Sequence, residues 1–286
     1  MINQNVKYWV EKIIDLAIEE DLGQQSDITS DHSISEDRNI NFNITARQDL
    51  IICGIDFIDL IFDKISKRYQ KNNIEYKNHF IDGNQVKSQE IIISGHGNAR
   101  LIFASERIIL NFIQNLSSIA TKSHKFAKIV QNSKIKILDT RKTIPAFRNL
   151  HKYAVKKGGC HNHRFSLFDA ILIKDNHIAA AGGVNQILTN ICSKNLQIPI
   201  EIECDNLQQV REAIRHNIDI IMLDNMNKKQ MKEAKEIIGN KAKIEISGGI
   251  TLDKIEKLLD LDIDYISVGQ LTNSIDIVDI GLDIIN

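Results

Sequence analysis

Residues 200–247 read IEIECDNLQQVREAIRHNIDIIMLDNMNKKQMKEAKEIIGNKAKIEIS, and one pattern repeats within them. Three short apolar runs alternate with two amphipathic helical stretches, in the order 200–203, 207–215, 220–223, 228–238 and 243–246. Alternation of strand and helix predicts parallel strands that are joined by right-handed crossovers. This stretch therefore indicates an α/β architecture.

The same pattern extends on both sides of this stretch. Further apolar runs at 135–138, 170–173 and 265–268 bring the number of expected strands to six. Eight strands would close a barrel, so six predict an incomplete barrel or an open doubly wound sheet. Nearly every run ends in a residue that can carry chemistry or leave room for a ligand: Asp139, Lys174, Glu203, Asp224, Ser247 and Gly269. Because only barrels bring all their strand ends to one mouth, the incomplete barrel is favoured.

The first third of the chain lacks this repeat. Apolar spacing predicts a helix over 6–17 that ends before Gly23, and alternation over 40–46 predicts a half-buried strand. The other expected elements are a helix at 56–66, strands at 74–80, 90–94 and 101–104, and two helices that meet near Thr121 within 105–130. This mixture predicts an α+β module before the repeat.

Charge and cysteine content exclude several classes of protein. The 286 residues include 36 basic and 37 acidic side chains, so a net charge of -1 gives no general attraction for nucleic acid or anionic membranes. None of the cysteines (Cys53, Cys160, Cys192 and Cys204) forms a Cys-x-x-Cys pair, which fits a reducing cytosol. Neither a signal peptide nor an apolar stretch of membrane-spanning length is recognised. We therefore expect a cytoplasmic protein without nucleic-acid or membrane partners.

Basic residues gather at the ends of the first two strands of the repeat. They occur in the segments 139–143 (DTRKT), 156–164 (KKGGCHNHR) and 173–177 (IKDNH). Any one of these segments is explained by a solvated basic loop. Together they would surround one mouth with five basic residues, namely Arg141, Lys142, His163, Arg164 and Lys174. So many cations need an anionic partner, and arginine binds carboxylates and phosphates in pairs, so a small polyanionic substrate is predicted.

The His161-Asn162-His163 triplet is also compatible with a zinc site or with a His-Asn-His nuclease. Zinc would need further ligands in a defined geometry. A nuclease would need a compact ββα metal site, which the strand–helix repeat does not supply. Anion binding is therefore the preferred interpretation.

Carboxylates follow the next two strands. Glu201 and Glu203 lie two residues apart and share one face of their strand, and Asp224 ends the following strand. Two carboxylates beside many cations suggest Mg²⁺, which prefers one or two carboxylates together with phosphate oxygens and water. A salt bridge explains Glu201 equally well, whereas metal binding is favoured for Glu203 and Asp224.

Glycines follow the last two strands. Residues 247–249 (SGG) and 267–269 (SVG) stand where barrels commonly bind phosphate, and glycine lets backbone N–H groups approach phosphate oxygens closely. Two such loops in succession indicate a phosphate site. The residues as a whole predict a diphosphate-activated sugar phosphate that meets an acidic co-substrate.

Seven groups of motifs occur in an order that is specific as a set. They are 20–23 (EDLG) with 27–29 (DIT), 105–107 (SER), 139–143 (DTRKT), 161–164 (HNHR), 173–177 (IKDNH), 223–225 (LDN) and 247–250 (SGGI). From about residue 20 to residue 272, the chain resembles the quinolinate phosphoribosyltransferases, which are also called carboxylating nicotinate-nucleotide pyrophosphorylases.

This resemblance implies a fold, an assembly and a reaction. We expect an N-terminal α/β sandwich domain at 1–115, which the C-terminal segment 275–286 would join, and an incomplete α/β barrel at 116–274. The implied assembly is a homodimer in which the N-terminal domain of one subunit covers the barrel mouth of the other. The implied reaction joins quinolinate to phosphoribosyl diphosphate and releases diphosphate and carbon dioxide, yielding nicotinate mononucleotide for NAD synthesis.

The resemblance also implies residue roles. Arg107 would reach the partner's site, Lys142 would contact phosphoribosyl diphosphate, and Mg²⁺ is the expected cofactor. The residues expected to bind substrate are Arg107, Arg141, His163, Arg164, Lys174, Ser247, Gly248 and Gly269. Those expected to act in catalysis are Lys142, Lys174, Glu203 and Asp224, and the last two are the expected metal ligands.

Four positions depart from the usual family pattern. Ala146, Cys160 and Ser118 stand where glycine is usual, and Asn273 stands where histidine is common. None of them removes a proposed charge, so we expect effects on substrate affinity rather than on the reaction.

Three alternative functions fit the sequence less well. A paralogue similar to molybdenum-transport accessory factors would relax the double-carboxylate pocket, and a non-catalytic anion sensor would not need Glu203 and Asp224. A nuclease would carry a basic excess, which the net charge of -1 does not provide.

Overall fold

The computed structural model describes residues 4–71, 73–194 and 196–285. Contacts between residues divide them into two compact units. The first unit comprises the described residues up to His124, then Thr143–Gly159, and those from Ser274 onward. The second comprises Lys125–Lys142 and Cys160–Asn273.

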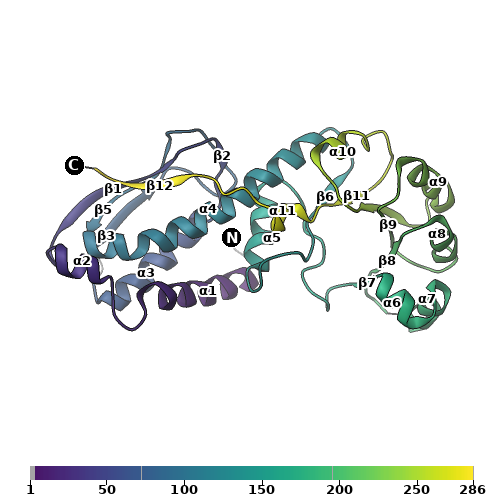
Figure 1. Cartoon of the computed structure of the whole chain (residues 1–286), viewed down its shortest axis with the longest axis horizontal. Helices are drawn as coiled ribbons and strands as arrows, with labels where there is room; N and C mark the ends of the chain where they lie inside the picture. Colours follow the sequence, from purple (N-terminus) through teal and green to yellow (C-terminus); the bar gives the residue numbers. More distant parts are fainter. Residues whose placement is uncertain (1–3, 72, 195, 286) are drawn as a thin grey trace. The chain divides into compact units, whose positions relative to one another are not determined.

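The first unit contains an antiparallel sheet (Figure 1). Its strands, in spatial order, are β12 (Ile280–Ile285), β1 (Asn39–Ala46), β5 (Ile91–Asn98) and β3 (Ile74–Asn78). A short pair, β2 (Leu50–Ile51) and β4 (Gln85–Val86), lies outside this sheet. Alternate residues of β1, including Phe42 and Ile44, are buried, as the alternation of apolar and polar residues predicted.

The first unit also contains helices, some of which cover one side of this sheet (Figure 1). They are α1 (Gln4–Leu22), α2 (Ile28–Ser33), the 3₁₀ turn η1 (Ile55–Phe57), α3 (Ile58–Tyr69), α4 (Ala99–Val130) and α5 (Arg148–Lys157). The rings of Phe42 on β1 and Phe62 on α3 lie 6.4 Å apart between their centroids. The core of this unit therefore lies between sheet and helices.

Two expectations for this unit are wrong. The apolar run 101–104 is not a strand, and no break occurs near Thr121, because both lie within the 32-residue helix α4. Short apolar runs do not distinguish a strand from a buried helical turn. Leu101, Ile102 and Ala104 are buried as part of a helical face that continues to Ile108.

The second unit is a six-stranded parallel sheet in the order β6-β11-β10-β9-β8-β7. These strands are β6 (Lys136–Leu138), β7 (Ile171–Ile173), β8 (Ile200–Cys204), β9 (Ile220–Asp224), β10 (Lys243–Ser247) and β11 (Tyr265–Ser267). All six expected strands are confirmed. β6 and β7 form the two edges, so the sheet remains open, as expected for an incomplete barrel.

Helices follow these strands, and those after β7, β8 and β9 lie together on one side of these strands (Figure 1). They are α6 (Asp175–Ala181), α7 (Val184–Cys192), α8 (Leu207–Ala213), α9 (Lys228–Ile238), α10 (Leu252–Glu256) and α11 (Gln270–Asn273). Asn206, Asn227 and Thr251 cap the helices that follow β8, β9 and β10, because each side chain accepts a backbone N–H of the first turn. These caps begin each helix soon after its strand and leave the strand ends free for a site.

The division into units differs from the predicted ranges at two internal segments and at one further residue, Ser274. Residues 116–124 and 143–159, which we expected in the barrel, belong to the first unit. Helix α5 packs there because the hydroxyl of Tyr153 lies 2.8 Å from Asp56 Oδ2 and 2.6 Å from Asp82 Oδ2. At the other end of the chain, β12 pairs with β1.

Among the described residues, no helix is both long enough and apolar enough to cross a membrane.

Candidate functional site

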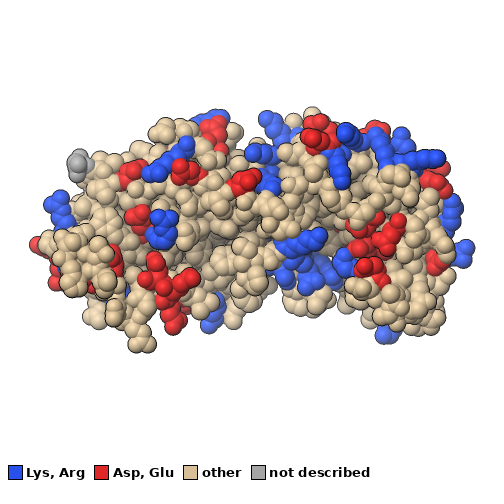
Figure 2. Space-filling view, in the orientation of Figure 1, with Lys and Arg blue, Asp and Glu red and all other residues tan. Residues whose placement is uncertain are grey.

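The candidate site is a cavity of about 360 Å³ at the carboxyl ends of the parallel strands. Its lining consists of Thr140, Arg141, Lys142, His163, Arg164, Leu172, Lys174, Glu203, Met222, Asp224, Ser247 and Ser267. In the right half of Figure 2, Lys and Arg side chains lie beside a group of Asp and Glu side chains. The fold thus brings eight of the predicted site residues to one place, all within the second unit.

Two arginines in this cavity have unused donors. Within the described part of the chain, the Nε atoms of Arg141 and Arg164 are buried without a hydrogen-bond partner. Burial, followed in importance by the charge of Arg141, lowers the pKa of Arg164. Buried donors normally have partners, so two arginines of this kind side by side favour an anionic ligand.

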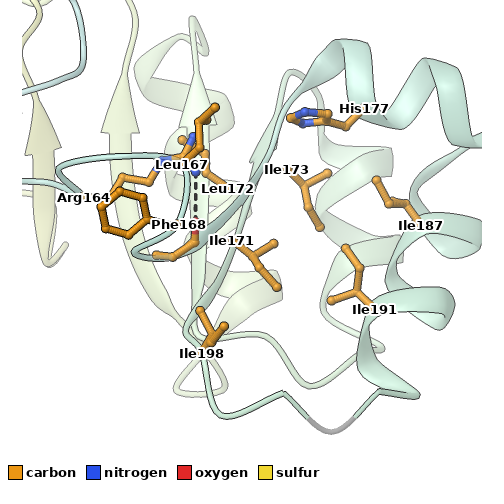
Figure 3. Close-up of a pocket in the computed structure, with 11 residues that line it drawn as sticks. Arg164, Leu167, Phe168, Ile171, Leu172, Ile173, His177, Ile187, Ile191 and Ile198 are labelled. Atoms are coloured by element: carbon orange, nitrogen blue, oxygen red, sulfur yellow. Dashed lines mark hydrogen bonds between the residues drawn. The ribbon is translucent and has the colours of Figure 1, made fainter.

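The loop around Arg164 is held in place by the strand that follows it. Arg164 Nη1 donates to the Ala170 carbonyl oxygen at 2.9 Å (Figure 3). Arg164 also borders a second cavity, of about 410 Å³, whose other lining residues are apolar except for His177 (Figure 3). This second cavity offers an anion few partners, so the first is the better candidate for a polyanionic ligand.

Asp139 holds the segment that carries His163 and Arg164. It is fully buried after β6. Its Oδ2 accepts from Asn162 Nδ2 at 2.6 Å, and its Oδ1 accepts from the backbone N–H of His163 at 3.0 Å. The backbone N–H of Asp139 donates to the His161 carbonyl oxygen at 3.1 Å. Asp139 is thus a scaffold for the mouth rather than part of its lining.

His163 contacts two buried carboxylates: Glu201, for which the sequence allowed a salt bridge or metal binding, and Glu245, which the sequence interpretation did not include. Its Nε2 lies 3.1 Å from Glu201 Oε2 and 3.6 Å from Glu245 Oε1, and Glu245 also accepts a hydrogen bond from Ser267. Its Nδ1 accepts from the backbone N–H of Arg164 at 2.7 Å. A proton on Nε2 therefore faces the carboxylates. Burial, and after it the charge of Glu201, raises the pKa of Glu245.

The sequence contained a signal for Glu245 that we did not use. Glu245 stands between two buried isoleucines, Ile244 and Ile246, and its own side chain is fully buried. A charged residue at a core position needs a partner, and here the partners come from neighbouring strands.

A second acidic group lies in the cavity itself. Glu203, Asp205 and Asp224 bring carboxylate oxygens within 4.8 Å of one another. Glu203 also forms an ion pair with Lys174 from the neighbouring strand end. Three carboxylates at this spacing fit a divalent cation that prefers oxygen ligands.

The glycine loops lie against the ends of β9 and β6. Gly248 has a φ of +99°, and a Cβ at this position would lie 2.2 Å from Asn225 Oδ1. A Cβ on Gly269 would lie 3.2 Å from Lys142 Cδ. Lys142 is itself fixed, because its carbonyl oxygen accepts from Thr272 Oγ1 at 2.8 Å. Both glycines thus allow a close approach of neighbouring residues that a side chain would prevent, and neither contributes to the lining.

Arg107 is the one predicted site residue of the first unit. It lies on α4 and lines a cavity of about 660 Å³ that Glu20 and Asp21 also line.

Comparison with known proteins identifies the family of this fold and site. Residues 27–117 match the model of the quinolinate phosphoribosyl transferase N-terminal domain, and residues 119–283 match that of the C-terminal domain. The chain belongs to the quinolinate phosphoribosyl transferase family. The predicted family and fold class are therefore confirmed.

Relatives of this chain cover nearly all of it. It is 36% identical to the probable carboxylating nicotinate-nucleotide pyrophosphorylase of Bacillus subtilis over 96% of this chain and 93% of the relative. It is 38% identical to that of Methanocaldococcus jannaschii over 98% of this chain and 99% of the relative. The crystal structure of nicotinate-nucleotide pyrophosphorylase from Ehrlichia chaffeensis superposes with a TM-score of 0.91 at 38% identity, covering 96% of this chain and 98% of that chain.

Two of the departures from the usual pattern of quinolinate phosphoribosyl transferases have visible consequences. Ala146 has a φ of 66°, a left-handed conformation that suits glycine better than alanine. The hydroxyl of Ser118 accepts the backbone N–H of Val278 at 2.9 Å, which anchors the segment before β12.

Proposed function

We propose that this protein is a pentosyltransferase that converts quinolinate and phosphoribosyl diphosphate into nicotinate mononucleotide, diphosphate and carbon dioxide, a step of de novo NAD synthesis. The observation that carries this proposal is that two arginines, whose buried Nε atoms have no partner among the described residues, line the same cavity of about 360 Å³ as the carboxylates of Glu203 and Asp224. The names of the relatives at 36% and 38% identity support the same reaction.

The cationic part of the cavity would bind quinolinate. Arg141 and Arg164 each offer a planar fork that matches a carboxylate, and Lys174 adds a charge that can move. His163 also lines the cavity, and its ring accepts the backbone N–H of Arg164. By holding Arg164 in place, His163 would help to orient the ring of quinolinate. Two carboxylates on adjacent ring atoms need several cations at one place, and this cavity provides them.

The acidic part would hold Mg²⁺ together with phosphoribosyl diphosphate. Glu203 and Asp224 are the proposed ligands, and Asp205 lies within reach of both. When bound, the cation would neutralise the negative charge of the diphosphate that leaves. The same two carboxylates would accept hydrogen bonds from the ribose hydroxyls.

The phosphate groups would lie along the loops after β10, β11 and β6. The 5′-phosphate would be bound by the hydroxyl of Ser247 and by backbone N–H groups of the loops that carry Gly248 and Gly269. Lys142 is exposed near Gly269, where its ammonium group would meet the diphosphate.

The residues would act mainly by positioning and by charge. Held by its carboxylates, quinolinate would direct its ring nitrogen at C1 of the ribose. The new N–C bond forms as the bond from C1 to the diphosphate oxygen breaks, and the ring becomes cationic. The carboxylate next to the nitrogen then leaves as carbon dioxide, because the electron pair left on the ring carbon is stabilised by that cation. A proton from solvent completes the product.

The direct test is an assay of the purified protein with quinolinate, phosphoribosyl diphosphate and Mg²⁺. We expect nicotinate mononucleotide by chromatography, and none when nicotinate replaces quinolinate. Excess chelator should abolish product formation, and added Mg²⁺ should restore it. Absence of product from a folded protein would reject the reaction, and full activity in chelator would reject the metal.

The working form would be a homodimer in which Arg107 completes the partner's site. Arg107 lies outside the unit that holds the cavity, and its own cavity carries the acidic residues Glu20 and Asp21. The compartment would be the cytoplasm, since Cys53, Cys160, Cys192 and Cys204 are all thiols rather than disulfides.

Subunit mixing tests this arrangement. Arg107→Ala and Arg141→Ala should each retain about 1% of the activity alone, whereas the refolded mixture should regain up to about one quarter of the wild-type activity, because about half of its dimers are mixed and one of the two sites in each mixed dimer is intact. Activity is measured after the two variants have been unfolded and refolded together. Absence of rescue when differently tagged subunits demonstrably copurify would contradict the shared site.

A further inference from the structure

Lys174 and Glu203 neutralise each other in the cavity. Lys174 follows β7 and Glu203 lies on β8, and their side chains form an ion pair. The Lys174 side chain is 45% exposed, whereas that of Glu203 is 11% exposed. The carboxylate is therefore the fixed member of this pair, and the lysine is the member that can move.

Each member of this pair is also suited to a different ligand. Glu203 belongs to the group with Asp205 and Asp224 that can hold a divalent cation. Lys174 lines the cavity beside Arg141 and Arg164, where an anion would bind. While the ion pair persists, the ammonium group of Lys174 is held by Glu203 and contributes less to anion binding.

We infer that Lys174 is a switch between the two halves of the site, so that a divalent cation at Glu203 releases Lys174 and thereby strengthens binding of the dicarboxylate substrate. This inference rests on the proposed function and adds a coupling between its two ligands. By thermodynamic reciprocity, the dicarboxylate must strengthen cation binding by the same factor. A bound cation favours release of Lys174 because it takes over the role of the lysine as the positive charge beside Glu203.

Glu203→Gln should strengthen quinolinate binding, although it removes a residue of the site. In metal-free protein this variant frees Lys174 at nearly constant side-chain volume, so quinolinate should bind about fivefold more tightly than to the wild type. Asp224→Asn is the matched control, because it removes the same charge from the same acidic group without touching the ion pair. It should change quinolinate affinity by less than about twofold.

A reciprocal measurement does not depend on quinolinate. Mn²⁺ binding, followed by electron paramagnetic resonance, should be about fivefold tighter in Lys174→Met than in the wild type, since the cation no longer competes with the lysine. Lys241→Met, which alters an exposed lysine on the loop before β10, is the control and should bind Mn²⁺ as the wild type does.

The quinolinate affinities of the wild type and of both variants are compared by calorimetric titration into chelator-treated protein. Tighter binding to Glu203→Gln than to Asp224→Asn supports the switch. Equal or weaker binding to Glu203→Gln overturns it, as does unchanged Mn²⁺ affinity in Lys174→Met. Either negative result leaves the proposed reaction standing if the wild type still forms nicotinate mononucleotide. A wild type that neither binds quinolinate nor forms product would instead refute the proposed function.

Discussion

Arg141→Ala should lower kcat/KM for quinolinate by about a hundredfold, or close to 3 kcal/mol of transition-state stabilisation. Arg141 lines the cavity, and its buried Nε has no partner among the described residues. Its removal would leave a substrate carboxylate without its strongest donor in a confined site. The loss should exceed that of a surface ion pair, which contributes less than about 1 kcal/mol.

Steady-state kinetics with both substrates varied measures this effect. Arg141→Lys keeps the charge but not the planar fork, so it should lie between the wild type and Arg141→Ala. Arg211→Ala, which breaks an exposed ion pair with Glu233, is the control and should retain full activity. If Arg141→Ala turned over quinolinate as the control does, Arg141 would have no part in substrate binding.

The second unit could be predicted from sequence because its signals are local. Each strand is a short segment that contains isoleucine, and the helices after β8, β9 and β10 each start at a capping residue close behind the strand. The carboxyl ends of parallel strands meet by necessity, so residues such as Arg141, Lys174 and Asp224 could be placed together without knowledge of any contact.

The side-chain pairs within the site could not be predicted from sequence, because they form between residues that are distant along the chain. The ion pair of Lys174 with Glu203 joins two strand ends that are 29 positions apart, and sequence spacing gives no measure of it. The contact of His163 with Glu201 and Glu245 likewise requires side chains from separate strands to share one buried face. His163 and Lys174, which were predicted to bind substrate, therefore also form ion pairs with carboxylates of the protein.

Helix α5 shows the same limit for domain boundaries. Its sequence falls between two strands of the parallel sheet, which predicts a barrel helix. Its packing is set instead by Tyr153 and by Gly158, where a Cβ would lie 2.3 Å from the Ala120 carbonyl oxygen. Only the tertiary structure reveals that this helix belongs to the first unit.

Gly248→Ala should impair the enzyme through its backbone and its volume together. The φ of +99° disfavours any side chain, and the added Cβ would lie 2.2 Å from Asn225 Oδ1 and 2.7 Å from Asn225 N. Asn225 donates to Asp224 Oδ2 at 2.6 Å, so its displacement would move a proposed ligand of Mg²⁺. We expect a loss of about 2–4 kcal/mol in unfolding free energy and at least a hundredfold drop, by order of magnitude, in kcat/KM for phosphoribosyl diphosphate.

Gly182→Ala separates the two causes. Gly182 has a comparable φ of +84°, but nothing lies within 4 Å of its would-be Cβ. This variant should therefore pay only the cost of the left-handed backbone, about 1–2 kcal/mol, and keep its activity. Denaturant unfolding and steady-state kinetics on both variants distinguish the effects. Normal activity in Gly248→Ala would mean that the loop after β10 can move without disturbing Asp224, and the phosphate site would then have to lie elsewhere.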